Sequence, residues 1–318
     1  MKHKILVGGQ AVIEGVMMRV PGAYATAVRK PDGNIEIARS EFKSLTERIP
    51  FLKKRVFRGI IALFEALKIG LNTLQLSADI AIKAEEEAKG KKQKSQGNFS
   101  KIITVLVAFI LGFGIFAVLP LYLTTELLDI ERKAITFNII VGLWRIVFFL
   151  IYLWAISLMK DIQTLFQYHG AEHKVVFTFE AGKNLTIENT REFKTFHPRC
   201  GTSFIFIVLL VSILMFALID SFIILGFGSI TLQLRILFHL ALLPLVAGVG
   251  YEFLKLTAKY QNKSIGKWLT MPGLWLQHIT TKPPSDDQVE IAIIALKAAF
   301  GDKFSDYEGK KYIAKAVD

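Results

Sequence analysis

Three histidines and the single cysteine of the chain fall within a short stretch, at His169, His173, His197 and Cys200. His169 and His173 are four residues apart, so on a helix their side chains project from the same face. Two residues separate His197 from Cys200, a spacing that lets a turn bring both to one ion. Imidazole and thiolate ligands favour Zn²⁺, with Fe²⁺ as the alternative, whereas Mg²⁺ and Ca²⁺ take oxygen ligands. The cluster therefore predicts a site for a divalent metal.

Two carboxylates are expected to complete this site. Glu172 precedes His173 and creates the order His-x-x-Glu-His, which inverzincin metalloproteases use with the glutamate as general base. We therefore expect Glu172 to be catalytic. Such enzymes also need a carboxylate ligand further along the chain, and Glu252 lies at a suitable membrane depth. Cys200 has a second interpretation as a nucleophile, because a helix that begins beside it would stabilise its thiolate.

The number of ligands decides what the metal would do. Three histidines and Cys200 would fill a tetrahedral site and make the metal structural, whereas three ligands leave a position for water and make it catalytic. The spacing alone leaves both outcomes open.

The elements that position these residues are expected to be membrane helices. The chain has 318 residues, of which 52% are hydrophobic and 21% are charged, so the charges must be segregated from the apolar stretches. A secreted mini-protein, a fibrous repeat and an ordinary cytosolic enzyme are thereby excluded. A single cysteine also excludes an internal disulfide and fits a reducing compartment.

Four apolar segments are long enough to cross a bilayer, which takes about 20 residues in a helix. A short turn joins the third to the fourth, so these two are expected to form an antiparallel hairpin. Arg145 and Asp220 lie inside spans and are expected to pair, since a lone charge in lipid is costly; an ion or substrate path is the alternative. The spans are predicted at 102–125, 137–159, from 202 to about 220, and 232–251.

The basic residues predict the orientation of these spans. Of the 39 lysines and arginines, 35 lie outside the spans on the side that carries both termini. The positive-inside rule therefore places the N- and C-termini in the cytoplasm. A net charge of +12 predicts an anionic partner, which we expect to be the anionic cytoplasmic leaflet of the bilayer. No nucleic-acid partner is expected, and the N-terminus has no signal-peptide pattern.

The fold class that follows is mainly α: a polytopic membrane protein with four transmembrane helices, a small N-terminal β unit and cytoplasmic amphipathic helices. Pro31-Asp32-Gly33 between β-rich flanks predicts a hairpin. Gly8-Gly9 predicts a tight turn or a close backbone approach, with an anion site as the less favoured alternative. Ser285 to Gln288 resembles a capping box that opens a final helix. The expected divisions are a β unit at 1–45, an amphipathic interfacial helix region at 46–84, a charged linker at 85–100, two spans within 101–159, a loop with the His/Cys cluster at 160–201, two spans within 202–252, and a helical region at 253–318.

Three separated motifs resemble the YqhQ-like family of bacterial membrane proteins. They are GGQAVIEGVMMR at 8–19, YHGAEHKVVFTFE at 168–180 with FHPRCGTSF at 196–204, and PGLWLQHITTKPP at 272–284. The family is a domain of unknown function whose members are described as predicted metal-dependent enzymes. The resemblance covers nearly the whole chain and implies a bacterial inner-membrane protein. It further implies a metal site at the three histidines and the cysteine, but it supplies no substrate.

Three functions are compatible with these observations. The leading hypothesis is a metal-dependent hydrolase that acts at the cytoplasmic face of the membrane, with Glu172 as general base. The second is a non-enzymatic scaffold or assembly factor, in which a structural zinc pins the loop to the spans while the β unit and the last helix bind a partner protein. The third is a transporter of a small solute or ion.

Overall fold

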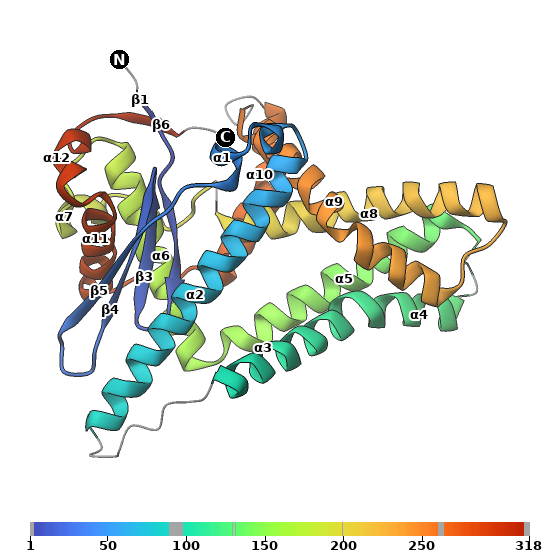
Figure 1. The fold of residues 1–318 in the computed structure, drawn as a ribbon, viewed down its shortest axis with the longest axis horizontal. Coiled ribbons are helices and arrows are strands. Elements are labelled where there is room, and N and C mark those ends of the chain that lie inside the picture. The colour runs from blue at the N-terminus through green and yellow to red at the C-terminus, as the bar shows by residue number, and fades with distance from the viewer. Residues whose placement is uncertain are drawn as a thin grey trace.

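The computed structural model describes residues 3–88, 98–128, 130, 132–198, 200–259 and 264–314. Figure 1 shows a layered part with a sheet at one end and a group of long helices that extends away from it. The chain is mainly helical with a small N-terminal sheet, which confirms the predicted fold class. Most of the predicted charged linker, residues 89–97, lies outside the described residues.

The sheet has four antiparallel strands in chain order. Asp32 in the predicted hairpin turn accepts a hydrogen bond of 2.9 Å from the backbone N–H of Asn34, and the two flanking strands pair. This confirms the hairpin. The turn expected at Gly8-Gly9 is wrong, because both glycines pair within the first of these strands. The strands are β2 (Gly8–Val12), β3 (Gly15–Val20), β4 (Ala23–Arg29) and β5 (Ile35–Glu41).

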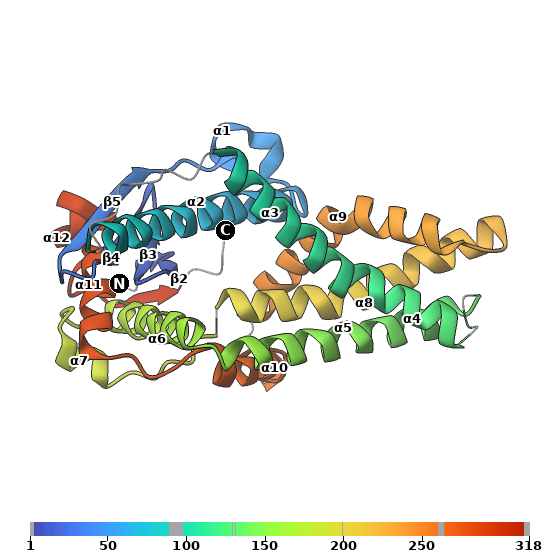
Figure 2. The same cartoon turned by 90° about the horizontal axis from the view of Figure 1, so that it is seen from below.

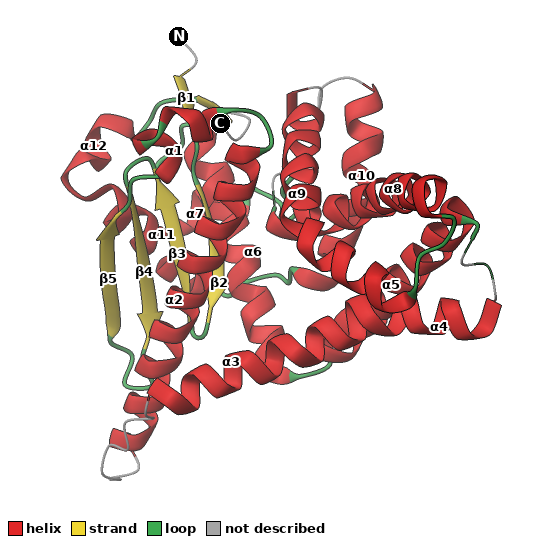
Figure 3. Cartoon of the chain, turned by 45° about the vertical axis from the view of Figure 1, so that its right-hand side comes forward, coloured by secondary structure: helices red, strands yellow, loops and turns green. Residues whose placement is uncertain are grey.

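Helices cover both faces of this sheet, and the strands bury apolar side chains on both of them. Alternate side chains along β3 point to opposite faces: Val16 and Met18 pack on one side, and Met17 packs on the other. The first face meets α6 (Lys160–Glu180) and α11 (Asp286–Phe300), and the second meets α2 (Phe57–Ala88), as Figure 3 shows. The side chain of Ser285 caps α11 and the Gln288 side chain reaches back to it, which confirms the predicted capping box.

The remaining elements connect or flank these layers. The first strand pairs in parallel with the last one, so the two ends of the described chain meet. These elements are β1 (His3–Ile5), α1 (Leu45–Arg48), a 3-10 turn (Pro50–Lys53), α7 (Ile187–Arg191), α10 (Ser264–Thr280), a 3-10 turn (Gly301–Lys303), α12 (Phe304–Tyr307) and β6 (Tyr312–Ala314).

Four long apolar helical segments correspond to the four predicted spans and extend together away from the sheet (Figure 2). They make the chain a multi-pass membrane protein. The third and fourth are joined by a short turn at Gly228, whose positive φ of 76° favours glycine, and this confirms the predicted hairpin. The segments are α3 (Asn98–Phe113) continuing through a π-helical turn (Gly114–Val118) into α4 (Leu119–Leu128), α5 (Ala134–Ser157), α8 (Gly201–Phe227) and α9 (Leu232–Lys259).

A fifth helix, α2, is also long and apolar enough to cross a membrane, one more than predicted. It begins against α9 and then runs along the sheet, where Gln10 of β2 donates a 2.9 Å hydrogen bond to Thr73. The pairing of β1 with β6 requires both ends of the chain to lie on one side of the membrane. An odd number of crossings cannot achieve this, so the five helices cannot all cross the membrane.

The expected pair between Arg145 and Asp220 is wrong. Asp220 instead lies 2.9 Å from the Arg235 side chain, accepts a 2.8 Å hydrogen bond from Asn138, and lies 3.1 Å from Nε2 of His239. Arg145 lies over the ring of Phe216, 5.5 Å from its centroid. The turn between α8 and α9 brings Arg235 next to Asp220, so Asp220 pairs with Arg235 and not with Arg145.

Candidate metal centre

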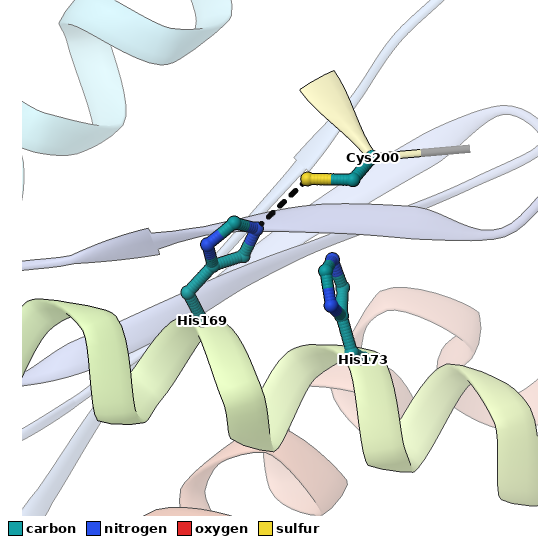
Figure 4. A group of neighbouring side chains, drawn as sticks. All are labelled: His169, His173 and Cys200. Atoms are coloured by element: carbon teal, nitrogen blue, oxygen red, sulfur yellow. Dashed lines mark hydrogen bonds between the residues drawn. The ribbon is translucent and has the colours of Figure 1, made fainter. Parts of the chain in front are cut away.

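The two histidines of α6 and the cysteine that precedes α8 point toward one another (Figure 4). His169 and His173 lie one helical turn apart on α6, and Cys200 is the N-cap residue of α8. Gly170, between the histidines, lies where any Cβ would collide with the carbonyl oxygen of Lys282. Glycine therefore lets α6 sit close to the segment after α10.

The geometry of these three side chains suits a metal. One ligand atom from each lies within 4.8 Å of the other two, and Nε2 of His169 is 3.1 Å from Sγ of Cys200. A tetrahedral zinc site with Zn–N and Zn–S bonds of about 2.0 and 2.3 Å would separate nitrogen from sulfur by about 3.6 Å. The His169–Cys200 pair would therefore need to open by only a few tenths of an ångström to share an ion. We call His169, His173 and Cys200 the His-His-Cys group.

Backbone carbonyls fix the orientation of both imidazoles. Nδ1 of His169 lies 2.8 Å from the carbonyl oxygen of Thr280, and Nδ1 of His173 contacts the carbonyl oxygen of Thr195. Because a carbonyl can only accept a hydrogen bond, each Nδ1 must carry a proton. Each neutral ring then keeps a lone pair on Nε2, the atom that faces the group. Metal-bound histidines are commonly held by this kind of second contact.

Without a metal, the group holds an ion pair. Burial disfavours a charged His169, but the adjacent Cys200 thiolate outweighs it and raises the pKa of His169 to about 9. Burial likewise disfavours the thiolate, yet His169 and then His173 lower the pKa of Cys200 well below its usual value. This shift favours the deprotonated form of the cysteine, which is the form that binds metal.

His197, which was expected to be a ligand, is adjacent to the group but is not one of its three members. Its ring centroid lies 5.4 Å from that of His173 and 4.4 Å from that of Phe177, and its Nε2 is 3.9 Å from a carboxylate oxygen of Glu180. The Gln277 side chain accepts from the backbone N–H of His197 at 2.7 Å and donates to its carbonyl at 2.8 Å. Gln277 thereby holds the loop that carries Cys200.

Glu252, which was also expected to be a ligand, pairs with a cation on α2. Both of its carboxylate oxygens bind Arg58 of α2, at 2.6 and 2.7 Å. Gly59 and Gly248 bring the start of α2 close to α9, since a Cβ on either would press on the other helix. This close approach puts the Arg58 guanidinium next to Glu252, and the carboxylate turns to it rather than to the His-His-Cys group.

Glu172, the expected general base, lies beside the group. The residue is 5% exposed, and one carboxylate oxygen is 3.5 Å from Nε2 of His173. Its methylene chain packs against Gly9 of β2. The structure therefore brings the N-terminal glycine motif to the side chain that sequence analysis selected as catalytic.

A cavity of about 500 Å³ opens next to these residues. Strands β2 and β3, helices α2 and α6, and the start of α8 enclose it. Its lining contains the three members of the group and Glu172 together with Gln10, Arg19, Glu65 and His197. Burial lowers the pKa of Arg19, although Glu65 opposes this effect. A polar molecule could therefore reach the group from this cavity.

We expect Gly9→Ala to destabilise the protein. The new Cβ would collide with the carbonyl oxygen of Met17 and lie 3.0 Å from both Cγ of Glu172 and Sδ of Met18. Overpacking of this kind costs about 1–3 kcal/mol. Gly8→Ala is the matched control, because a Cβ there meets nothing within 4 Å. Thermal unfolding in detergent should show a lower midpoint for Gly9→Ala alone, and equal midpoints for the two variants would contradict this packing.

All three motifs of the YqhQ-like resemblance meet at this centre: Gly9 backs Glu172, the central motifs supply the group, and the C-terminal motif supplies Thr280 and Gln277. A family model described as "Protein of unknown function (DUF1385)" matches residues 54–302. "Uncharacterized protein YqhQ" of Bacillus subtilis (strain 168) is 34% identical over 309 residues, covering 92% of each chain. The chain belongs to this family. No solved structure matches it.

Sequence reasoning missed the residues that orient the group. Thr195 and Thr280 act through their backbone carbonyls, which no side-chain pattern reveals. Gln277 had a usable signal, because it is a polar residue in the apolar run GLWLQHI and it is fully buried. A buried amide needs partners, and its partners here are the backbone groups of His197.

Proposed function

We propose that this chain is a metal-dependent membrane hydrolase whose zinc ion, or alternatively Fe²⁺, is held by Nε2 of His169, Nε2 of His173 and Sγ of Cys200. One observation carries the proposal: two backbone carbonyls hold the imidazoles so that both Nε2 atoms face the thiol. A buried pair of histidines fixed in this way beside a low-pKa cysteine is the donor set that zinc prefers.

Three ligands beside an open cavity support a catalytic role rather than a structural one. Structural zinc sites are closed by four protein ligands, whereas catalytic sites keep one position for water or substrate. When bound, the metal would polarise a carbonyl or phosphoryl oxygen and make a nearby water acidic enough to react near neutral pH. Glu172 would accept the proton of that water and deliver it to the leaving group. The Thr195 and Thr280 carbonyls keep both histidines oriented meanwhile.

The centre is proposed to face the cytoplasm. The segments that surround it carry most of the lysines and arginines, and the positive-inside rule assigns such segments to the cytoplasmic side of the bacterial inner membrane. On α2, Phe64, Leu67 and Leu71 are all more than half exposed and lie on one face at helical spacing. Lys68 lies among them, so α2 suits an anionic leaflet.

The proposal is tested by titrating the chelator-treated, full-length protein with Zn²⁺. We expect one ion per chain. Because the pKa of His169 is about 9 in the metal-free protein, its proton competes with the metal at lower pH. One proton should therefore be released per ion at pH 7, and the apparent affinity should rise about tenfold per pH unit up to pH 9. Calorimetry in buffers of different ionisation enthalpy measures both quantities. A folded protein that binds no metal would contradict the proposal.

A further inference from the structure

A second cavity, of about 400 Å³, lies among the membrane spans. The end of α3, the π-helical turn and α4, together with α5, α8 and α9, contribute to it. Apolar side chains make up nearly all of its lining, among them Phe116, Phe149, Ile205, Leu209 and Leu240. Ile205 and Leu240 are 51% and 42% exposed, so the cavity is open rather than sealed within the bundle.

This second cavity shares one face of α8 with the cavity at the metal centre. On α8, Gly201 lines the first cavity, and Ile205, one turn further along, lines the second. Ser212, three turns from Gly201, still lines the second cavity, so one face of α8 serves both. On α9, Tyr251 lines the first cavity and Leu240, about three turns away, lines the second. The two cavities therefore follow one another along the same faces of α8 and α9.

Polar side chains lie at the end of the second cavity that is far from the metal centre. Arg145 and His239 line the second cavity there, and His239 binds Asp220. From Ile205 to Phe216, where Arg145 lies over the ring, α8 rises about 16 Å at 1.5 Å per residue. A hydrocarbon chain that extended further would have to separate buried charged groups from their partners, which is energetically unfavourable. The polar end therefore limits the length of hydrocarbon chain that the second cavity can hold.

We propose that the substrate is a membrane amphiphile: its polar, hydrolysable group occupies the first cavity at the metal centre, and one hydrocarbon chain occupies the second. The part concerning the polar group rests on the proposed hydrolase function, whereas the chain site stands on the second cavity itself. Hydrolysis would add one water across an acyl or phosphoryl bond. The hydroxyl goes to the carbonyl carbon or phosphorus, and the proton passes through Glu172 to the departing oxygen or nitrogen.

The test uses the full-length protein in nanodiscs of phosphatidylethanolamine and phosphatidylglycerol, with a phosphatidylglycerol probe that carries a diazirine in one acyl chain. After irradiation, mass spectrometry should place cross-links on the cavity faces of α8 and α9, near Ile205 and Leu240. Leu209→Trp fills the second cavity and should reduce these cross-links at least fivefold. Leu214→Trp is the matched control, because Leu214 is 68% exposed on α8 and does not line the cavity. Leu240→Trp serves if Leu209→Trp fails to fold.

Metal content, measured by elemental analysis of the same samples, separates this inference from the proposed function. Cavity cross-links that Leu209→Trp removes while the metal is retained support both. Cavity cross-links in a protein that binds no metal support the chain site and overturn the hydrolase. Cross-links that Leu209→Trp and Leu240→Trp leave unchanged, or that fall only on outward faces such as that of Leu214, overturn the chain site.

Discussion

Cys200→Ser is expected to weaken zinc binding by at least about 100-fold, since even loss of a residue that merely supports a ligand costs about 10–100-fold. The serine hydroxyl stays protonated near neutral pH and is a poor zinc ligand, whereas the cysteine is held as a thiolate by His169. Serine also removes the partner that raises the pKa of His169. Elemental analysis of the purified variant, followed by competition against a chelator of known affinity, measures the loss.

Two histidine variants make this result specific. His278→Gln changes an exposed histidine on α10 and should leave zinc affinity unchanged. His197→Gln should lower the affinity by less than about threefold if three ligands hold the metal, because Nε2 of His197 faces Glu180. A loss as large as that of Cys200→Ser would instead reveal a closed, four-ligand site. It would favour the scaffold or assembly factor, with its partner protein, over the hydrolase.

The local features of this structure could be predicted from the sequence. Uninterrupted apolar runs predict the spans because a bilayer demands them, and Pro31-Asp32-Gly33 predicts its hairpin because few residues suit such a turn. The spacing of His169 and His173 predicts a shared helix face, because residues four apart on a helix project from the same side. Each of these patterns lies within one element and depends on one physical constraint.

The partners of the charged residues could not be predicted from the sequence, because tertiary packing selects one of several possible partners. Arg145 and Arg235 are both candidates for Asp220 by sequence, and only the α8–α9 hairpin decides for Arg235. The close approach of α2 at Gly59 makes Arg58 the partner of Glu252. The partner of Gly9 was equally hidden, since it depends on α6 packing across β2.

Glu172→Gln is expected to lower hydrolysis by about 10²–10⁴-fold while leaving metal content and stability unchanged. The amide has nearly the shape of the carboxylate, so its packing against Gly9 survives, but it cannot accept a proton from water. The assay is turnover of a fluorogenic acyl ester and a fluorogenic phosphate ester, each presented in mixed micelles. Metal content by elemental analysis and the thermal unfolding midpoint are measured on the same preparation.

Glu192→Gln supplies the control for this variant, because Glu192 is an exposed carboxylate that pairs with Lys183 away from the cavity. It should leave turnover, metal content and unfolding unchanged. Turnover that is equal in wild type and Glu172→Gln would show that Glu172 is not the base. A Glu172→Gln protein that loses its metal would assign the carboxylate to the ligand set, which would fill the position that a reacting water needs. Lost turnover with retained metal therefore separates proton transfer from metal binding.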